Sequence, residues 1–419
     1  MYWEGKVSAI AQASTVQITA VSGTPSDATY TITIGGVKIA VVGETNVATT
    51  ANNLKVALAA STHPYFAAVT WTVSTDTVTG TAVTAGEEFV ATSSVAGGTG
   101  TIGAVSSSVA NSSPNDWSDA DNWSGGAVPA NADVVIIKNT SVSIMWGFAQ
   151  SAVDLTSLTV EKSFTGTIGL RADTFLSAGA SVATVGEYRA LYLDIGSTDI
   201  DLGEHNGPGA PAGSVRINID NDKSSASELR VHATADSGEG SNPAVSYLAA
   251  HSGADIEVRD APGGVGIATL VPAETATVGD VNVTSPDSTT NVYIGPGCTL
   301  TNFSQKQGIN EINAAADITA VVVDGGLLLL DGIEYAVATM TINDGTVTDK
   351  RVDSGGAEIA TLNMNGGELD LTGSAAARTI TACNFKAGRI LLDDDDVTIS
   401  SGFIGTATGK RTVTVERGV

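Results

Sequence analysis

One stretch of the chain decides its fold: Ile359-Ala-Thr-Leu362-Asn-Met364-Asn-Gly-Gly367-Glu-Leu369. Apolar residues stand eight, five and three positions before the second glycine, and another stands two positions after it. Apolar and polar residues therefore alternate on both sides of a glycine turn, which indicates a strand, a turn and a second strand. Such a unit cannot bury its apolar face by itself, so copies of it must stack.

The same pattern occurs in five copies near the C-terminus. The turn glycines lie 18, 19, 22 and 21 residues apart, close to the length of one coil in a β-solenoid. The last four copies share the full pattern, and their repeat positions are Val321, Val323, Gly326, Met340, Ile342, Gly345, Leu362, Met364, Gly367, Cys383, Phe385 and Gly388. Because stacked copies would bury these apolar residues, we expect a single-stranded parallel β-helix.

Composition agrees with a mainly β protein. The 419 residues include 47 Gly, much Thr, Val and Ala, and almost no sustained helical periodicity. These residues favour strands and turns, so helices should be rare. With 42% hydrophobic residues the chain can build the cores of two or three domains.

We expect three segments along the chain. Residues 1–105 should form a small α+β module in ββαββ order, with a β-hairpin over residues 29–43 and one helix that begins after Thr45 as its N-cap. Residues 106–150 should form a Trp-rich linker and cap. Residues 151–419 should form the parallel β-helix, with clear coils from about residue 300. Insertions at residues 203–213 and 236–242 should form loops on one side of it.

Two tryptophans mark the start of the predicted β-helix. Trp117 and Trp123 precede a Gly-Gly turn, a proline and a β-rich run. A bulky aromatic pair can close the first coil, whose open end would expose a hydrophobic core and unpaired strand edges. The alternative is that the two rings stack on a sugar. We favour the cap.

The charge of the chain excludes one class of partner. The formal net charge is −25, from 45 acidic and 20 basic side chains. Such a chain is repelled by phosphate backbones, and no basic stripe offsets the repulsion, so we expect no direct nucleic-acid binding. No apolar run approaches the ~20 residues of a membrane span, and the start lacks a secretory signal. We therefore expect a soluble protein made in a cytoplasm, with no membrane contact.

A search for chemical motifs predicts no catalytic residue, no cofactor and no metal. The four histidines occur singly, without the spacing of metal ligands. The acidic run Asp393–Asp396 is interpreted as a solvated corner rather than a Ca²⁺ site, because consecutive strand residues point to opposite faces. Cys298 and Cys383 both lie in apolar repeat contexts, so we expect buried thiols rather than a disulfide.

Several stretches carry a resemblance to known proteins. The hairpin around Gly35-Gly36, the helix Asn46–Ala60 and the segment Ser61–Phe66 resemble a small domain of tailed-bacteriophage structural proteins. With the start Met1–Gly5, the stretches 115–129 and 141–147 and the repeats, the whole chain is similar to a family of uncharacterised phage and prophage proteins. Members of that family tend to be encoded among virion morphogenesis genes, near the major capsid protein. The resemblance implies a place in a virion and carries no catalytic residues.

We therefore expect a non-enzymatic virion protein, made in the host cytoplasm, that decorates or cements the capsid exterior. The module would bind the major capsid protein and the β-helix would project outward or straddle neighbouring capsomers. Shell proteins meet at local threefold points, which favours a homotrimer.

Two alternatives remain at this level. A tailspike or tail fibre would bind a host surface glycan, and a cleaving one needs two carboxyl groups about 5 to 10 Å apart. Long sugar-binding grooves usually expose several aromatic rings, whereas aromatic residues are 5% of this chain. A bacterial surface adhesin is the second alternative, and the lack of a secretion signal counts against it.

Overall fold

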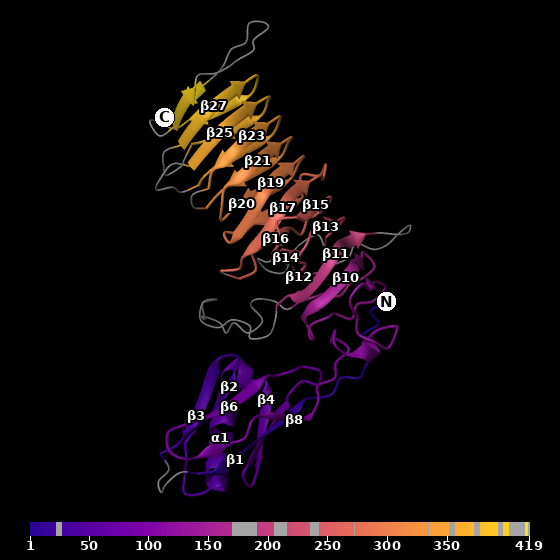
Figure 1. Cartoon of the computed structure of the whole chain (residues 1–419), viewed down its shortest axis with the longest axis vertical. Coiled ribbons are helices and arrows are strands. Elements are labelled where there is room, and N and C mark those ends of the chain that lie inside the picture. The colour runs from indigo at the N-terminus through magenta and orange to yellow at the C-terminus, as the bar shows by residue number, and fades with distance from the viewer. Residues whose placement is uncertain are drawn as a thin grey trace.

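The computed structural model describes residues 1–21, 27–169, 191–204, 216–234, 243–271, 273–332, 335–351, 357–372, 378–392, 397–401 and 415–417. The protein is mainly β, as the sequence predicts. An antiparallel module near the N-terminus is followed by a long array of parallel strands (Figure 1). The run Asp393–Asp396, residues 205–213 of the first predicted loop and all of the second lie outside the described residues.

The module holds two antiparallel sheets, one long helix and one short helix. Its elements are β1 (Ala13–Ala20), β2 (Thr29–Ile34), β3 (Val37–Val42), α1 (Val47–Ala60), α2 (Pro64–Ala67), β4 (Val69–Ser74), β5 (Thr77–Ala82), β6 (Ala91–Ala96), β7 (Thr101–Ile102) and β8 (Ser106–Val109). In one sheet β1 lies between β5 and the short strands β7 and β8, and β4 pairs with β5. In the other, β2 lies between β3 and β6. The two sheets and α1 share one apolar core.

The predicted hairpin is confirmed, whereas two other predictions for the module need correction. The β2–β3 hairpin turns at Gly35 and Gly36, which both have positive φ. The N-cap of α1 is Asn46 and not Thr45, since Asn46 Oδ1 accepts a 2.8 Å hydrogen bond from the Thr49 N–H. The module also has more strands than the ββαββ order, because β1 and β5 are rich in Thr and Ala and give little apolar alternation.

The parallel array follows the short 3₁₀ helix η1 (Ala120–Asn122). Its strands are β9 (Val134–Ile137), β10 (Ala149–Glu161), β11 (Leu193–Glu204), β12 (Ile217–Asn221), β13 (Ser227–Val231), β14 (Val245–Ala249), β15 (Ala254–Val258), β16 (Val265–Ile267), β17 (Ala276–Val283), β18 (Asn291–Ile294), β19 (Cys298–Gln305), β20 (Ile309–Ile312), β21 (Ile318–Val323), β22 (Leu327–Leu330), β23 (Val337–Ile342), β24 (Thr346–Asp349), β25 (Ala357–Met364), β26 (Glu368–Asp370), β27 (Arg378–Phe385), β28 (Arg389–Leu392), β29 (Val397–Ser401) and β30 (Val415–Arg417).

The strands of the array pair in two ladders. β9, β10 and β11 are successive parallel neighbours, and β11 then pairs with both β12 and β13. Beyond this point each strand pairs with the strand two further along the chain, as β21 does with β23 and β22 with β24. We call these the odd ladder and the even ladder. Each repeat of about twenty residues therefore gives one strand to each ladder.

Equivalent positions of the sequence repeat stack directly on one another. In the odd ladder Val321, Met340, Leu362 and Cys383 are successive Cα partners. A second row of partners consists of Val323, Ile342, Met364 and Phe385. In the even ladder the corresponding row consists of Leu328, Val347, Leu369 and Ile390. All of these side chains are buried in one continuous core.

The turn glycines form a stack of their own. Gly326, Gly345, Gly367 and Gly388 all have positive φ, between 66° and 106°. A Cβ on Gly367 would lie 2.5 Å from the carbonyl oxygen of Gly345, and that oxygen accepts a 2.8 Å hydrogen bond from the Glu368 N–H. Because a side chain would meet both an unfavourable backbone angle and a backbone atom, the repeat requires glycine at this turn.

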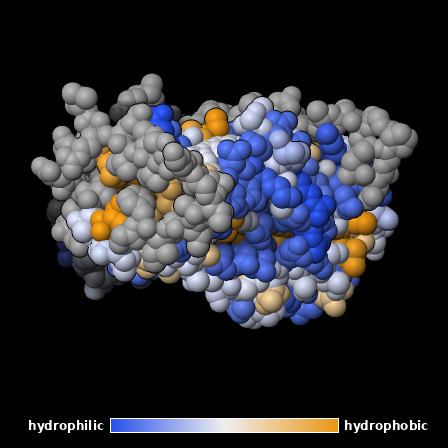
Figure 2. Space-filling view, turned by 90° about the horizontal axis from the view of Figure 1, so that it is seen from above, coloured by the Kyte–Doolittle hydropathy of each residue, from blue (hydrophilic) through white to orange (hydrophobic). Residues whose placement is uncertain are grey.

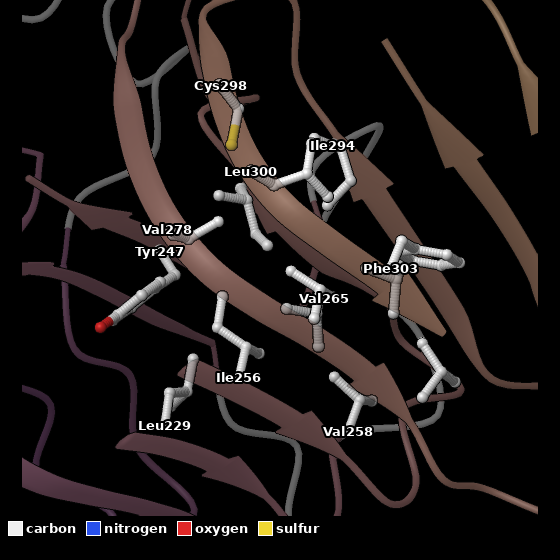
Figure 3. Close-up of a cluster of buried hydrophobic side chains, with 14 of the residues drawn as sticks. Leu229, Tyr247, Ile256, Val258, Val265, Val278, Ile294, Cys298, Leu300 and Phe303 are labelled. Carbon is white, nitrogen blue, oxygen red and sulfur yellow. The ribbon is translucent and has the colours of Figure 1, made fainter. Parts of the chain in front are cut away.

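Figure 3 shows the interior of the middle repeats. Side chains such as Leu229, Ile256 and Phe303 point from their strands into a shared apolar interior. Cys298 and Cys383 are free and buried, as predicted. Burial raises the pKa of the Cys298 thiol to about 12, so this sulfur stays protonated and unreactive near neutral pH.

Candidate functional sites and surfaces

Three tryptophans pack together at the N-terminal end of the array. Trp117 and Trp123 are fully buried, with ring centroids 4.6 Å apart in an edge-to-face arrangement. Trp3 packs on Trp123 from the other side at 5.1 Å, and its Nε1 donates a 3.0 Å hydrogen bond to the carbonyl of Val142. Trp123 Nε1 donates to the carbonyl of Trp117 at 2.8 Å. With their faces covered by protein, Trp117 and Trp123 offer no ring on which a sugar could stack.

The first residues of the chain lie with these tryptophans rather than with the module. The Met1 ammonium donates a 2.8 Å hydrogen bond to the carbonyl of Val134 at the start of β9, and the Glu4 N–H donates one to the carbonyl of Asn122. The chain then leaves toward the module and returns beside itself. Where it returns, Ile10 and Ser112 form an antiparallel bridge with an N–H···O distance of 2.8 Å. The module is therefore an insertion in the chain between Trp3 and Trp117, and two adjacent chain segments joined by this bridge connect it to the tryptophans.

One face of the module is nearly free of charge. The outward residues of β2, β3 and β6 are Thr29, Thr31, Thr33, Lys38, Ala40, Val42, Thr92, Ser94 and Ala96. Among the described residues, β3 and β6 each pair with β2 alone, so each has one unpaired edge. Only six of the 45 acidic and three of the 20 basic side chains lie in residues 1–110. The strong negative charge thus belongs to the rest of the chain.

A group of carboxylates lies on the outward face of the even ladder where it begins. Asp194 on β11 and Asp220 on β12 are direct Cα partners. Burial, then the nearby charges of Asp194, Asp222 and Glu274, raises the pKa of Asp220 to about 6. Glu274 accepts a 2.9 Å hydrogen bond from the Tyr192 hydroxyl and a 2.8 Å one from the Leu270 N–H. Burial also raises the pKa of Glu274.

With a pKa of about 6, Asp220 exchanges its proton near that pH. Like charges in a partly buried setting resist being ionised together, so one carboxyl keeps its proton above its usual range. A pair with one protonated and one ionised member is what acid–base cleavage of a glycosidic bond requires. Sequence analysis did not find this group, because its members are spread over residues 194 to 274 and come together only in the folded array.

A second charged network lies on the outward face of the odd ladder. Arg230 on β13 makes ion pairs with Asp199 and Asp201 of β11 and with Glu228. His232 places Nε2 3.0 Å from Asp201 Oδ1 and Nδ1 3.2 Å from an Arg259 nitrogen. These charged groups pair with one another on the surface. Figure 2 shows that much of the described surface seen from above is hydrophilic.

The interior of the array also contains charge, in its later repeats. Asp349 at the end of β24 is fully buried, with Arg351 and Arg378 beside it. The hydroxyl of buried Tyr335 donates a 2.9 Å hydrogen bond to the carbonyl of Ile312, and Arg351 stacks over the Tyr335 ring at 4.8 Å. Sequence reasoning missed this cluster, because isolated charged residues in a loop-rich chain look solvated.

The described residues offer little to a metal or a sugar. Among them, no group of three or more His, Cys, Asp or Glu side chains is placed to hold a metal ion. Tyr2 and Tyr293 are the only aromatic residues of the described part that stand among the exposed large apolar side chains. Within the described ranges, none of the helices has the length and apolar character to cross a bilayer.

Comparison with known proteins returned no relative. No family model matches the chain, and a search of curated proteins gave no match to its sequence.

Proposed function

We propose that the parallel array is a β-solenoid, in which each repeat is one coil and the odd and even ladders are two of its faces. The pairing of each strand with the strand two further along supports this proposal. The stacked turn glycines support it as well, because they place the bend between the two strands of every repeat at the same point. The three tryptophans then serve as its N-terminal cap.

On this architecture the chain acts as a non-enzymatic structural protein of a tailed-phage virion, most plainly as a capsid decoration or cement protein. The distribution of charge between the two parts carries the proposal. The module combines a nearly uncharged sheet face with two open strand edges, which suits close contact with another protein. The array carries most of the charge of −25 and suits exposure in many copies on a particle surface, where mutual repulsion limits aggregation.

The connection between the module and the array agrees with a binding role for the module and an exposed position for the array. Because two chain segments that are hydrogen-bonded to each other connect module and cap, a force on the array reaches the module through both segments. Many copies, each bound by a modest interface to the major capsid protein, would together resist pressure from within the shell.

A tailspike or tail fibre that binds host surface glycan is the second candidate, and one observation favours it. The paired Asp194 and Asp220, with the raised pKa of Asp220, resemble the carboxyl pair of a glycosidase. The exposed aromatic side chains Tyr2, near the start of the chain, and Tyr293, on β18, lie far apart in the sequence, and two such rings give weak support for a long sugar-binding groove.

Copy number separates the two candidates. Quantitative mass spectrometry of purified virions would compare this chain with the major capsid protein. We expect about one copy per capsid subunit, whereas a ratio of a few per cent would place the protein on the tail and overturn the decoration role.

A second experiment tests the module face directly. The full-length Ala40→Glu/Ser94→Glu variant adds two charges beside Thr31, whose neighbours in the sheet are Ala40 and Ser94. We expect it to lose binding to particles stripped of the protein, while a Thr361→Glu control on the array binds like the wild type. Equal binding of both variants would show that this face is not the contact.

A further inference from the structure

An apolar strip runs along the outward face of the even ladder. Tyr293 on β18 and Ile309 on β20 are 38% and 48% exposed, and Leu327 and Leu329 on β22 are partly exposed. Side chains alternate along a strand, so these four point away from the core while Leu328 and Leu330 point into it. Ile309 and Leu327 are direct Cα partners, which makes the strip continuous across two strands. We call these four residues the apolar strip.

The two rows of the strip continue through uncharged residues as far as β24 and then reach Glu368 and Asp370 on β26. Thr346 and Thr348 continue its two rows onto β24, and Asn291 precedes it on β18. Between β18 and β24, Glu311 is the one carboxylate within the rows, where it lies between Tyr293 and Leu329. Burial, followed by the nearby charge of Asp331, raises its pKa.

The outward face of the odd ladder at the same level is different. There Asn302 on β19 donates a 2.7 Å hydrogen bond to Asp280 on β17, and Ser304 donates a 2.7 Å one to Asn282. This row of polar side chains suits contact with water. The apolar strip therefore marks one particular face of the array as the one that gains from being covered, since burying exposed apolar surface is favourable by roughly 25 cal/mol per Å².

The net charge of the chain indicates which kind of molecule covers the apolar strip. Copies with a net charge of −25 repel one another over most of their surface. The strip and its threonine continuation contain one carboxylate, Glu311, with Asp331 and Lys350 close to it at the edge, and form a face on which such copies can approach closely. The rows repeat at the spacing of parallel strands, about 4.8 Å, so three copies arranged around a threefold axis along the array would bring equivalent strands to the same level.

We infer that the apolar strip is the contact between copies of this chain in a homotrimer whose arrays lie side by side and parallel. Leu327 and Leu329 lie at the centre of each contact, and Tyr293 and Ile309 extend it toward the N-terminal end. Exposed Lys350, close enough to Glu311 to influence its charge, lies at the rim, where it can offset Glu311 of a neighbouring copy. The inference rests on the proposed function for its choice of three copies, because closed threefold symmetry matches the threefold points of a shell.

Sedimentation equilibrium of the full-length protein tests the inference. For the wild type we expect three times the chain mass of 42.2 kDa. The Leu327→Glu/Leu329→Glu variant places two further negative charges in the contact, and its mass should fall threefold with an unchanged circular dichroism spectrum. A milder Leu327→Ser/Leu329→Ser variant should weaken association at least tenfold and covers the case in which the double glutamate fails to fold.

The matched control changes the other face. Thr339 and Thr361 are outward Cα partners in the odd ladder, and the Thr339→Glu/Thr361→Glu variant adds the same charge there. This control should remain a trimer. A monomeric wild type, or folded strip variants that stay trimeric, would overturn the inference.

The test of the apolar strip and the test of the proposed function can fail independently of each other. Virions that carry about one copy per capsid subunit of a monomeric protein would keep the decoration role and reject the strip as a contact. A trimer found at a few per cent of the capsid subunits would keep the strip and reject the decoration role.

Discussion

Arg351 and Asp349 form a two-point ion pair inside the array. The Arg351 Nε lies 2.9 Å from Asp349 Oδ1 and one terminal nitrogen lies 2.6 Å from Oδ2, with both side chains shielded from solvent. Arg378 approaches the same carboxylate, with its Nε 3.4 Å from Oδ2. One buried negative charge thus serves two buried positive charges.

Asp349→Asn should strongly destabilise the protein. It keeps the shape of the side chain but leaves two guanidinium groups without their counter-charge, which should lower the free energy of unfolding by about 3–5 kcal/mol. Urea unfolding followed by circular dichroism measures the loss. Asp121→Asn, at an exposed position in the cap, is the control. A loss below about 1 kcal/mol would mean that the guanidinium groups do not depend on Asp349.

Truncating a core side chain in the repeats should strongly lower the free energy of unfolding. Leu362 and Ile380 are fully buried, so replacing either by Ala should cost about 2–5 kcal/mol through lost apolar contact and the cavity left behind. The outward neighbour Thr361 gives a matched control, and Thr361→Ala should change the stability by less than about 0.5 kcal/mol. Equal melting temperatures for Leu362→Ala and the control would contradict the packing described here.

A side chain at Gly367 should disrupt the turn. Gly367→Val meets both the positive φ of 66° and the carbonyl oxygen of Gly345, so the melting temperature should fall. Gly125 in the cap has an ordinary φ, and its nearest contact for a Cβ is 3.6 Å away, so Gly125→Ala should be tolerated. Thermal unfolding of both variants is the measurement. An unchanged melting temperature for Gly367→Val would refute the need for glycine there.

The carboxylate group around Asp220 should make stability depend on pH. Its pKa is about 6 in the folded chain against an ordinary value of 3.8, so the folded state holds this proton more tightly than the unfolded state. The ionised carboxylate therefore opposes folding at pH 7, and the opposition is relieved as the pH falls through 6 toward 4.

Asp220→Asn tests this dependence. The variant should be more stable than the wild type at pH 7, and its gain in unfolding free energy between pH 7 and pH 5 should be smaller. Asp121→Asn again serves as the control and should follow the wild-type profile. If the two profiles of Asp220→Asn and wild type were parallel, the carboxylate group would not carry the pH dependence.

The cap should depend on the third residue of the chain. Trp3→Ala removes a nearly buried ring that packs on Trp123, and should lower stability by about 3–5 kcal/mol. Hydrogen exchange should accelerate in β9 and β10 and stay unchanged in β27 and β28. Tyr2→Ala changes the neighbouring exposed ring and should leave both regions protected. Uniform acceleration along the array after Trp3→Ala would argue against a local cap.

The parallel strands of the repeats were predictable because their determinants are local. Alternation decides which side chains face inward, and the glycine turn sets where one strand ends and the next begins. These two signals placed Val321, Met340 and Leu362 at equivalent positions, and the structure pairs them in that order.

Features that depend on contacts between distant residues could not be predicted from the sequence. The first copy of the repeat has Gln305 and Asn310 where later copies have apolar residues, which suggests a break in the core. In the structure both are buried and satisfied, since Asn310 Nδ2 donates to Gln305 Oε1 at 3.0 Å and Gln305 Nε2 donates to the carbonyl of Gly325 at 2.7 Å. The packing of Trp3 on Trp123 likewise joins residues 120 positions apart and leaves no periodic trace.

The bridge between Ile10 and Ser112 makes the module exchangeable in evolution. Because the hundred residues between them enter and leave at one place, a gene can replace that cassette by recombination at two points without altering the tryptophans of the cap. If the module binds a shell as proposed, a different module could carry the same array to a different shell, while mutations in the array would leave that contact unchanged. Host or particle specificity and the body of the protein can diversify independently.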